Sequence, residues 1–133
     1  RVIQQAHDLN CRTALFIDED FSHFEALLAT QTDRIELYTG PYAQRFSGNN
    51  DDLKDLVTLA KTLSDKGIDI NAGHDLNQAN LAFLLKHIPQ IAEVSIGHAL
   101  TCDALTNGWA ATIKAYLERC QQPRIPTHKT LKN

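Results

Sequence analysis

Three apolar segments of this chain carry, at or near their ends, polar residues that are capable of acid–base chemistry, and a helical pattern follows each segment. The segments span residues 34–40, 68–77 and 93–100. Glu36 lies in the first segment, whereas His74 and His98 lie toward the ends of the second and third. Short apolar runs that alternate with helical patterns are typical of parallel β/α units. In barrels built from such units, functional groups gather at the carboxyl ends of the strands, where these three residues would fall.

The β/α unit occurs four times along the chain. We expect strands at residues 11–18, 34–39, 68–72 and 93–96. The first contains a short continuous apolar run, residues 14–17, as expected of a strand buried on both faces. Helical spacing predicts a helix at residues 2–9, another from about 51 to 66 and another from Asn77 to 88. A further helix is expected after the N-cap candidates Asp18 and Asp20, with Phe21 on its apolar face. A last helix from about Asp103 would bury Leu105, Trp109, Ile113, Tyr116 and Leu117.

Two segments are predicted to lie outside regular structure. Glycine and proline mark residues 40–50 as a long loop, a length typical of loops at active sites. Residues 121–133 are polar, contain two prolines and show no period, which predicts a flexible tail after a folded part at residues 1–120.

Four parallel β/α units can form an open doubly wound sheet or half of a closed barrel. No glycine-rich dinucleotide fingerprint follows the first strand, which disfavours the doubly wound alternative. Polar residues occur inside the apolar strands at Glu36, Asn71 and Ser95, as they would if they faced the mouth of a barrel. The pattern therefore favours an α/β fold of the (β/α)8 TIM-barrel type, of which this chain supplies four units.

Composition excludes several classes of partner. The 133 residues are 43% apolar and 22% charged, as in ordinary globular proteins, and the net charge of −3 leaves no broad cationic face for nucleic acid. No apolar run approaches the roughly 18–20 residues of a membrane span, and the first residues do not resemble a signal peptide. We expect neither nucleic acid nor membrane as a partner.

The three cysteines, Cys11, Cys102 and Cys120, are widely spaced and form no C-x-x-C motif. An odd number of scattered cysteines is typical of reduced thiols in a cytosolic protein rather than of a disulfide framework or a zinc site. The chain is therefore expected to be cytoplasmic.

Glu36 and His74 are the first two candidates for catalysis. A carboxylate between the apolar Ile35 and Leu37 needs either a basic partner from a neighbouring strand, which would make it structural, or a catalytic role as an acid, a base or a stabiliser of positive charge. His74 follows Gly73, which permits close ligand approach, and precedes Asp75, which could orient the imidazole. A purely structural histidine is the alternative.

Gly97 and His98 are candidates for binding an anion. The loops after the last two strands of a barrel often hold phosphate through backbone N–H groups, and these residues follow the last predicted strand. The alternative is a simple glycine turn before the last helix. Glu36, His74 and His98 could also converge as a metal site with two histidines and one carboxylate, but no H-x-H or H-x-x-x-H spacing supports that, so no metal is expected.

These motifs together resemble a known family, the deoxyxylulose-dependent pyridoxine 5′-phosphate synthases of vitamin B6 biosynthesis. The matching segments are residues 14–18, 33–43, 71–77 and 93–100, in the same order and spacing. The resemblance covers residues 1–120, and the last three motifs in combination are highly specific.

The resemblance implies a fold, a reaction and site residues. The family is a (β/α)8 barrel that assembles as a homo-oligomer, typically an octamer. It condenses 1-deoxy-D-xylulose 5-phosphate with 3-amino-2-oxopropyl phosphate to give pyridoxine 5′-phosphate, phosphate and water, without metal or organic cofactor. By resemblance, His74 is the proton donor and Glu36 the transition-state stabiliser. Asp75, Gly97 and His98 match positions that bind the aminoketone phosphate.

The resemblance also places this sequence in the carboxyl-terminal half of the family's chain, at strands five to eight. The sequence opens on Arg1 and not on methionine, so we expect it to be part of a longer polypeptide and, taken alone, to lack groups needed for turnover. One alternative is a half barrel that binds phosphorylated small molecules without turnover. Another is a different phosphate-handling barrel enzyme, although no lysine lies in a predicted strand to serve a Schiff-base aldolase.

Overall fold

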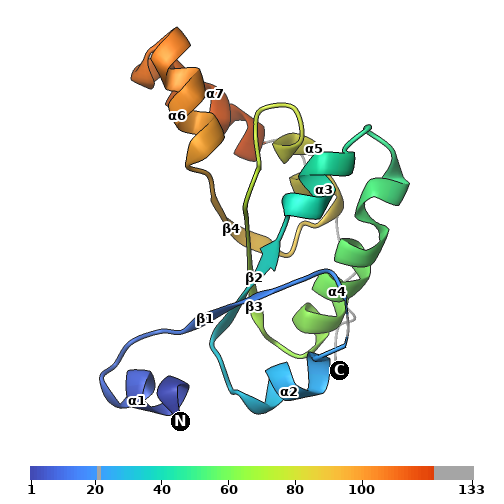
Figure 1. Ribbon diagram of the computed structural model, residues 1–133, viewed down its shortest axis with the longest axis vertical. Helices are drawn as coiled ribbons and strands as arrows, with labels where there is room; N and C mark the ends of the chain where they lie inside the picture. Colours follow the sequence, from blue (N-terminus) through green and yellow to red (C-terminus); the bar gives the residue numbers. More distant parts are fainter. Residues whose placement is uncertain (21, 122–133) are drawn as a thin grey trace, which may run out of the picture.

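The computed structural model describes residues 1–20 and 22–121, in which helices alternate with four strands (Figure 1). The strands are β1 (Ala14–Ile17), β2 (Arg34–Tyr38), β3 (Asp69–Gly73) and β4 (Ile91–Ser95). The helices are α1 (Val2–Asp8), α2 (Phe24–Ala29), α3 (Gly40–Arg45), the 3-10 turn η1 (Asn50–Leu53), α4 (Lys54–Asp65), α5 (Leu81–His87), α6 (His98–Asn107) and α7 (Trp109–Cys120).

The strands form one parallel sheet in the order β1-β2-β3-β4. Each strand follows its neighbour in sequence, so every connection returns along the sheet through a segment that contains helix. The α/β class and the four parallel strands predicted from the sequence are confirmed.

The two faces of the sheet differ in burial, and β2 shows the difference most clearly. Ile35 and Leu37 are fully buried, and they join a core built with leucines of α4 and α5. Arg34, Glu36 and Tyr38 alternate with them and are only half-buried. On the same face as Glu36, Phe16 of β1 is 64% exposed. One face is therefore packed against helices, and the other is polar, aromatic and open.

Residues 40–50 were expected to be a loop, and that expectation is wrong for much of the segment. Thr39 precedes α3, and Pro41 in its first turn has the fixed φ that a helix start requires. Asp52 then organises the rest of the segment, since its carboxylate accepts hydrogen bonds from the backbone N–H groups of three successive residues, Ser47, Gly48 and Asn49. These bonds keep the pKa of Asp52 below its usual value.

The last predicted helix is in fact two helices, and its predicted apolar face is mostly exposed. α6 begins at His98, five residues before Asp103, and ends at Asn107. The next residue, Gly108, has a φ of +81°, which is unfavourable for other residues. Of the five residues expected to be buried, only Tyr116 is; Leu105 is 80% exposed, and the others are more than one-third exposed.

Smaller differences concern the ends of elements. β4 begins two residues earlier than predicted, at Ile91. α2 begins at Phe24, and Asp20 accepts hydrogen bonds from Ser22 instead of capping that helix. The prediction for Phe21, and that for the tail apart from Gln121, lie outside the described residues.

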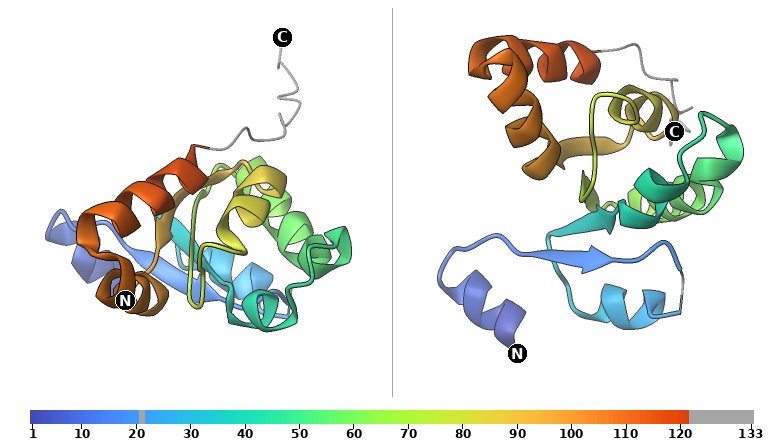
Figure 2. Two further views of the ribbon diagram at one scale, coloured as in Figure 1. Left: turned by 90° about the horizontal axis from the view of Figure 1, so that it is seen from above. Right: turned by 45° about the horizontal axis from the view of Figure 1, so that its top comes forward.

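Figure 2 shows α6 and α7 side by side at one end of the molecule, joined to the sheet through the segment after β4. None of the described helices is both long enough and apolar enough to span a bilayer.

Candidate functional site

The carboxyl ends of β2, β3 and β4 lie at one edge of the sheet. Tyr38 pairs with Gly73, and Gly73 pairs with Ser95, so the residues that follow these three positions meet at that edge. This register brings the segments that contain His74 and His98 next to each other, as the sequence predicted for the ends of parallel strands.

The carboxylate of Glu36 lies directly over Gly73. A Cβ atom added at Gly73 would overlap Oε1 of Glu36, so glycine is the residue that leaves room for this carboxylate beside His74. The structural alternative, in which a neighbouring basic residue neutralises Glu36, finds no support among the described residues. Arg34 on the same strand instead bonds to Glu93 at 2.8 Å.

His74 and Asp75 occupy a strained turn at the end of β3. Their φ angles are +86° and +58°, a region that residues with side chains seldom adopt. His74 Nδ1 lies 3.2 Å from Asp75 Oδ2, and its ring meets the ring of Tyr38 edge-on at 4.8 Å between centroids. Asp75 thus lies within reach of the imidazole that the sequence predicted it to orient, and Tyr38 adds a second contact that the sequence did not indicate.

Thr39 holds this strained turn in place, and sequence reasoning missed it. Its backbone N–H donates to the Gly73 carbonyl at 2.9 Å, and its hydroxyl lies 2.7 Å from the same oxygen and 2.6 Å from the His74 carbonyl oxygen. Thr39 is completely buried. Backbone strain of this kind persists only where surrounding bonds enforce it, and Thr39 supplies those bonds.

A cavity of about 430 Å³ lies between the ends of β3 and β4. One wall is formed by residues 74–77 and the other by residues 95–99. Gly97 is the N-cap of α6, and His98 is its first residue, so the positive end of the helix dipole borders the cavity. No heavy atom lies within 4 Å of the position that a Cβ on Gly97 would take, which leaves its backbone open to a ligand.

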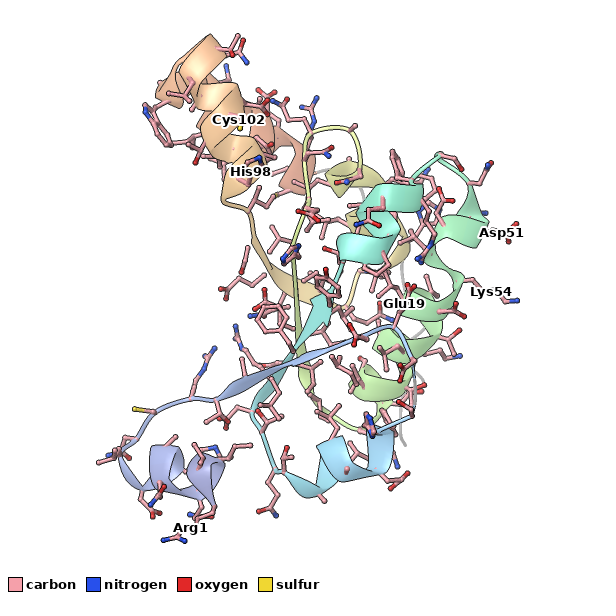
Figure 3. The ribbon with its side chains drawn as sticks, viewed as in Figure 1. Arg1, Glu19, Asp51, Lys54, His98 and Cys102 are labelled. Carbon is pink, nitrogen blue, oxygen red and sulfur yellow. The ribbon has the colours of Figure 1, made fainter. Side chains whose placement is uncertain are left out.

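His98 also lies beside a thiol. Its Nε2 is 3.8 Å from Sγ of Cys102. Figure 3 labels both residues, which lie one turn apart on α6. Both side chains are exposed.

Comparison with known proteins identifies the family. The family model described as pyridoxal phosphate biosynthesis protein PdxJ matches residues 1–122. The chain belongs to the PdxJ family. This finding confirms the resemblance deduced from the motifs.

The PdxJ relatives include proteins named pyridoxine 5′-phosphate synthase. The chain is 48% identical to the one from Parabacteroides distasonis over 106 residues, which cover 79% of this chain and 44% of the relative. It is 48% identical to that of Chelativorans sp. over 83% of the chain and 46% of the relative. For the Albidiferax ferrireducens protein, identity is 43% over 92% of the chain and 50% of the relative. The chain thus spans about half the length of these relatives.

A second cavity in this PdxJ-family chain, of about 340 Å³, lies on the open face of the sheet. It is lined by Phe16, Ile17, Asp18, Tyr38 and His74. His74 borders both cavities and therefore stands between an anion-favouring helix end and an aromatic surface.

The metal site considered from the sequence is not supported. Among the described residues, no group of three or more His, Cys, Asp or Glu side chains is placed to hold a metal ion. Glu36, His74 and His98 therefore lie around one edge of the sheet without forming a ligand set.

Proposed function

We propose that this chain forms the last four β/α units of a (β/α)8 pyridoxine 5′-phosphate synthase, with residues 1–120 as the part that belongs to the barrel. The reaction joins 1-deoxy-D-xylulose 5-phosphate to 3-amino-2-oxopropyl phosphate and releases pyridoxine 5′-phosphate, phosphate and water. Family membership and the names of the relatives support the reaction. The observation that carries it is the placement of His74 at the cavity beside the start of α6, with the Glu36 carboxylate against the preceding residue, Gly73.

In this proposal His74 is the proton donor. The condensation forms an imine, eliminates water and phosphate, and closes an aromatic ring, and each of these steps moves protons. An imidazole that is half-exposed, oriented by Asp75 and located between two cavities suits that task.

Glu36 stabilises the transition state. Imine intermediates carry positive charge, and a fixed carboxylate stabilises such charge without reorganisation. Two observations support this role. Arg34 on the same strand pairs with Glu93 and not with Glu36, and the Glu36 carboxylate lies against Gly73, next to His74.

Asp75, Gly97 and His98 bind the phosphorylated aminoketone. The N-terminus of α6 offers unpaired backbone N–H groups to an anion, and the cavity between residues 74–77 and 95–99 has room for a small phosphate ester. Asp75 lies across the cavity from α6, where its carboxylate could accept a hydrogen bond from the substrate amine.

The test is complementation. We would produce this chain together with the amino-terminal half of the P. distasonis relative and measure pyridoxine 5′-phosphate formation. We expect activity from the pair, little from either half alone, and a decrease on the order of 10²-fold or more for His74→Ala. His23→Ala removes an exposed histidine outside the proposed catalytic and substrate-binding residues and is the matched control. Full activity of the His74→Ala pair would refute the catalytic assignment.

A second candidate function is binding of a phosphorylated small molecule without turnover. It is favoured by the open face of the sheet, where Phe16 is exposed, and by the cavity at α6, which this chain forms by itself. Calorimetry with inorganic phosphate and with each substrate distinguishes the two. Binding by this chain alone, with no activity in the complementation test, would favour the second candidate.

The proposal extends to assembly and location. We infer a homo-oligomer, an octamer in the complete protein, located in the cytoplasm, that acts on small phosphorylated substrates without metal or organic cofactor. Sedimentation of the complemented protein would show an assembly several times the mass of one barrel, and a monomeric barrel would contradict this part of the proposal.

A further inference from the structure

α6 has few apolar contacts to fix its direction. Ala104 is its only buried residue among those described, and Leu100 packs partly against the core. The helix is attached to β4 through Gly97, around which there is open space. Figures 1 and 2 show α6 and α7 standing together beyond the end of the sheet. Apart from its packing against α7, few apolar contacts therefore fix the direction of α6 relative to the sheet.

A polar cluster connects α6 to the opposite wall of the cavity. Oδ2 of Asp103 in α6 accepts a hydrogen bond from Nε2 of Gln78 at 2.9 Å and another from the hydroxyl of Tyr116 in α7 at 3.0 Å. Gln78 directly follows the wall formed by residues 74–77. We call Gln78, Asp103, Tyr116 and Arg119 the Asp103 cluster.

The cluster also fixes the backbone of that wall. Nε of Arg119 in α7 donates to the Gln78 carbonyl at 2.7 Å, and another nitrogen of its guanidinium donates to the Ala115 carbonyl at 3.2 Å. Gln78 is thus held through its side chain by α6 and through its backbone by α7. Both bonds are partly buried, where a charged hydrogen bond is stronger than at an exposed surface.

Tyr116 gives the cluster a fixed point in the core. It is buried and belongs to the same core as the leucines of α4 and α5. Burial, together with the bond to Asp103, raises the pKa of Tyr116 to about 12, so its hydroxyl remains a donor at neutral pH. Asp103 is therefore bonded to a side chain that cannot move without disturbing the core.

We propose that the Asp103 cluster is a positioning device that sets the direction of α6 and so the geometry of the anion site at Gly97 and His98. The inference rests on the proposed function, in which that site binds a substrate phosphate. None of the four residues lines the cavity, so the cluster acts through the walls that it joins. An error of about 1 Å in the position of such a site lowers rate or affinity substantially.

The test uses three variants of the chain. Asp103→Ala removes the acceptor at the centre of the cluster. Asp103→Asn keeps an acceptor oxygen, so we expect it to retain much of the α6 geometry and phosphate affinity that Asp103→Ala loses. Tyr116→Phe removes only a hydroxyl and preserves the core, which guards against the first variant failing to fold. Glu118→Ala, which removes an exposed carboxylate from α7, is the matched control.

Two readouts separate positioning from a merely structural role. The first is the set of amide residual dipolar couplings of α6 relative to those of the sheet, measured without ligand. The second is the dissociation constant for inorganic phosphate, from titration of the Gly97 and His98 amide signals. For Asp103→Ala we expect reduced couplings confined to α6 and α7, and phosphate affinity about tenfold weaker, the factor that corresponds to losing one charged hydrogen bond.

The outcomes distinguish this inference from the proposed function. If the unaltered chain binds no phosphate, the anion site is wrong, and the couplings of Asp103→Ala and Tyr116→Phe still decide whether the cluster directs α6. If Asp103→Ala and Tyr116→Phe leave the couplings and the phosphate affinity unchanged, or change only the thermal midpoint, the positioning role is refuted.

Discussion

At the scale of single residues, the absence of a side chain at Gly73 gives the Glu36 carboxylate its place next to His74. A methyl group at Gly73 would occupy the place of the Glu36 carboxylate, so Gly73→Ala must displace that carboxylate or the strand. We expect a loss of about 1–3 kcal/mol in the free energy of unfolding, typical of overpacking, and loss of complemented activity. Urea unfolding measures the first effect.

Gly97→Ala is the matched control for stability. A Cβ atom at Gly97 meets no heavy atom within 4 Å, and the residue is not in the left-handed region, so its stability should change little. Equal losses in the two variants would show that the Glu36–Gly73 contact is not the cause.

Thr39 is the residue whose effect on the site was least visible in the sequence. Thr39→Val preserves shape but removes the hydroxyl next to the Gly73 and His74 carbonyls, and we expect about 1–3 kcal/mol of lost stability because a buried polar partner is removed. Thr39→Ser keeps the hydroxyl and should therefore retain most of the stability that Thr39→Val loses. Thermal unfolding of the two variants provides the comparison, and a Ser variant as unstable as the Val variant would contradict the role of the hydroxyl.

The site residues that could be predicted from the sequence are polar residues at positions where an apolar strand residue or a simple turn would be expected. A glutamate inside an apolar strand and a histidine after a strand glycine are conspicuous, and the structure brings both to one edge. Thr39 is not conspicuous, because threonine is common both in strands and before helices. The Asp103 cluster joins residues more than twelve positions apart along the chain, and a single sequence carries no signal for such contacts.

At the scale of elements, the strands were predictable because each is a short apolar run between polar turns. The division of the last helix was not, since helical periodicity continues through Gly108 and the break comes from its positive φ. The apolar face of α7 was misassigned for a related reason: the pattern predicts an amphipathic helix but cannot say whether a partner covers it. α3 was missed because glycine and proline are typical of turns, although proline is also common in the first turn of a helix.

α1 offers a test of attachment at the same scale. It buries no residue, and His7 connects it to Asp33, whose Oδ2 lies 3.0 Å from His7 Nε2 and accepts the Thr13 N–H at 2.6 Å and the Thr13 hydroxyl at 2.9 Å. These bonds lower the pKa of Asp33 from 3.8 to about 2, and the bond from the Thr13 backbone N–H has the largest effect.

A carboxyl group whose pKa is lower in the folded state stabilises the fold fully above its unfolded pKa, and this stabilisation is lost as pH falls through the folded pKa. We expect the free energy of unfolding to decrease between about pH 3.8 and pH 2, with faster hydrogen exchange in α1. Asp33→Asn should be less stable at neutral pH, and its free energy of unfolding should depend less steeply on pH between about pH 3.8 and pH 2. An unchanged slope in Asp33→Asn would mean that another carboxylate causes the decrease.

At the scale of the whole molecule, the sheet has one packed face and one open face, and the proposed barrel assigns the open face to its interior. Phe16 and Leu37 lie on these two faces: Phe16 is 64% exposed, whereas Leu37 is fully buried. In this chain alone, Phe16→Ala should change the free energy of unfolding by no more than about 0.5 kcal/mol, as an exposed position does. Leu37→Ala should cost about 2–5 kcal/mol.

Addition of the complementary half should change only one of these values. If the first four β/α units close the barrel, Phe16 becomes buried, and Phe16→Ala should then cost up to about 3–5 kcal/mol, whereas the cost of Leu37→Ala should remain as it was. Chemical denaturation of the complemented protein, compared with this chain alone, measures both. A Phe16→Ala effect that stays small in the complemented protein would mean that the open face is not the interior of a barrel. The edge that carries Glu36 and His74 would then remain open to water and unable to exclude it from reactive imine intermediates.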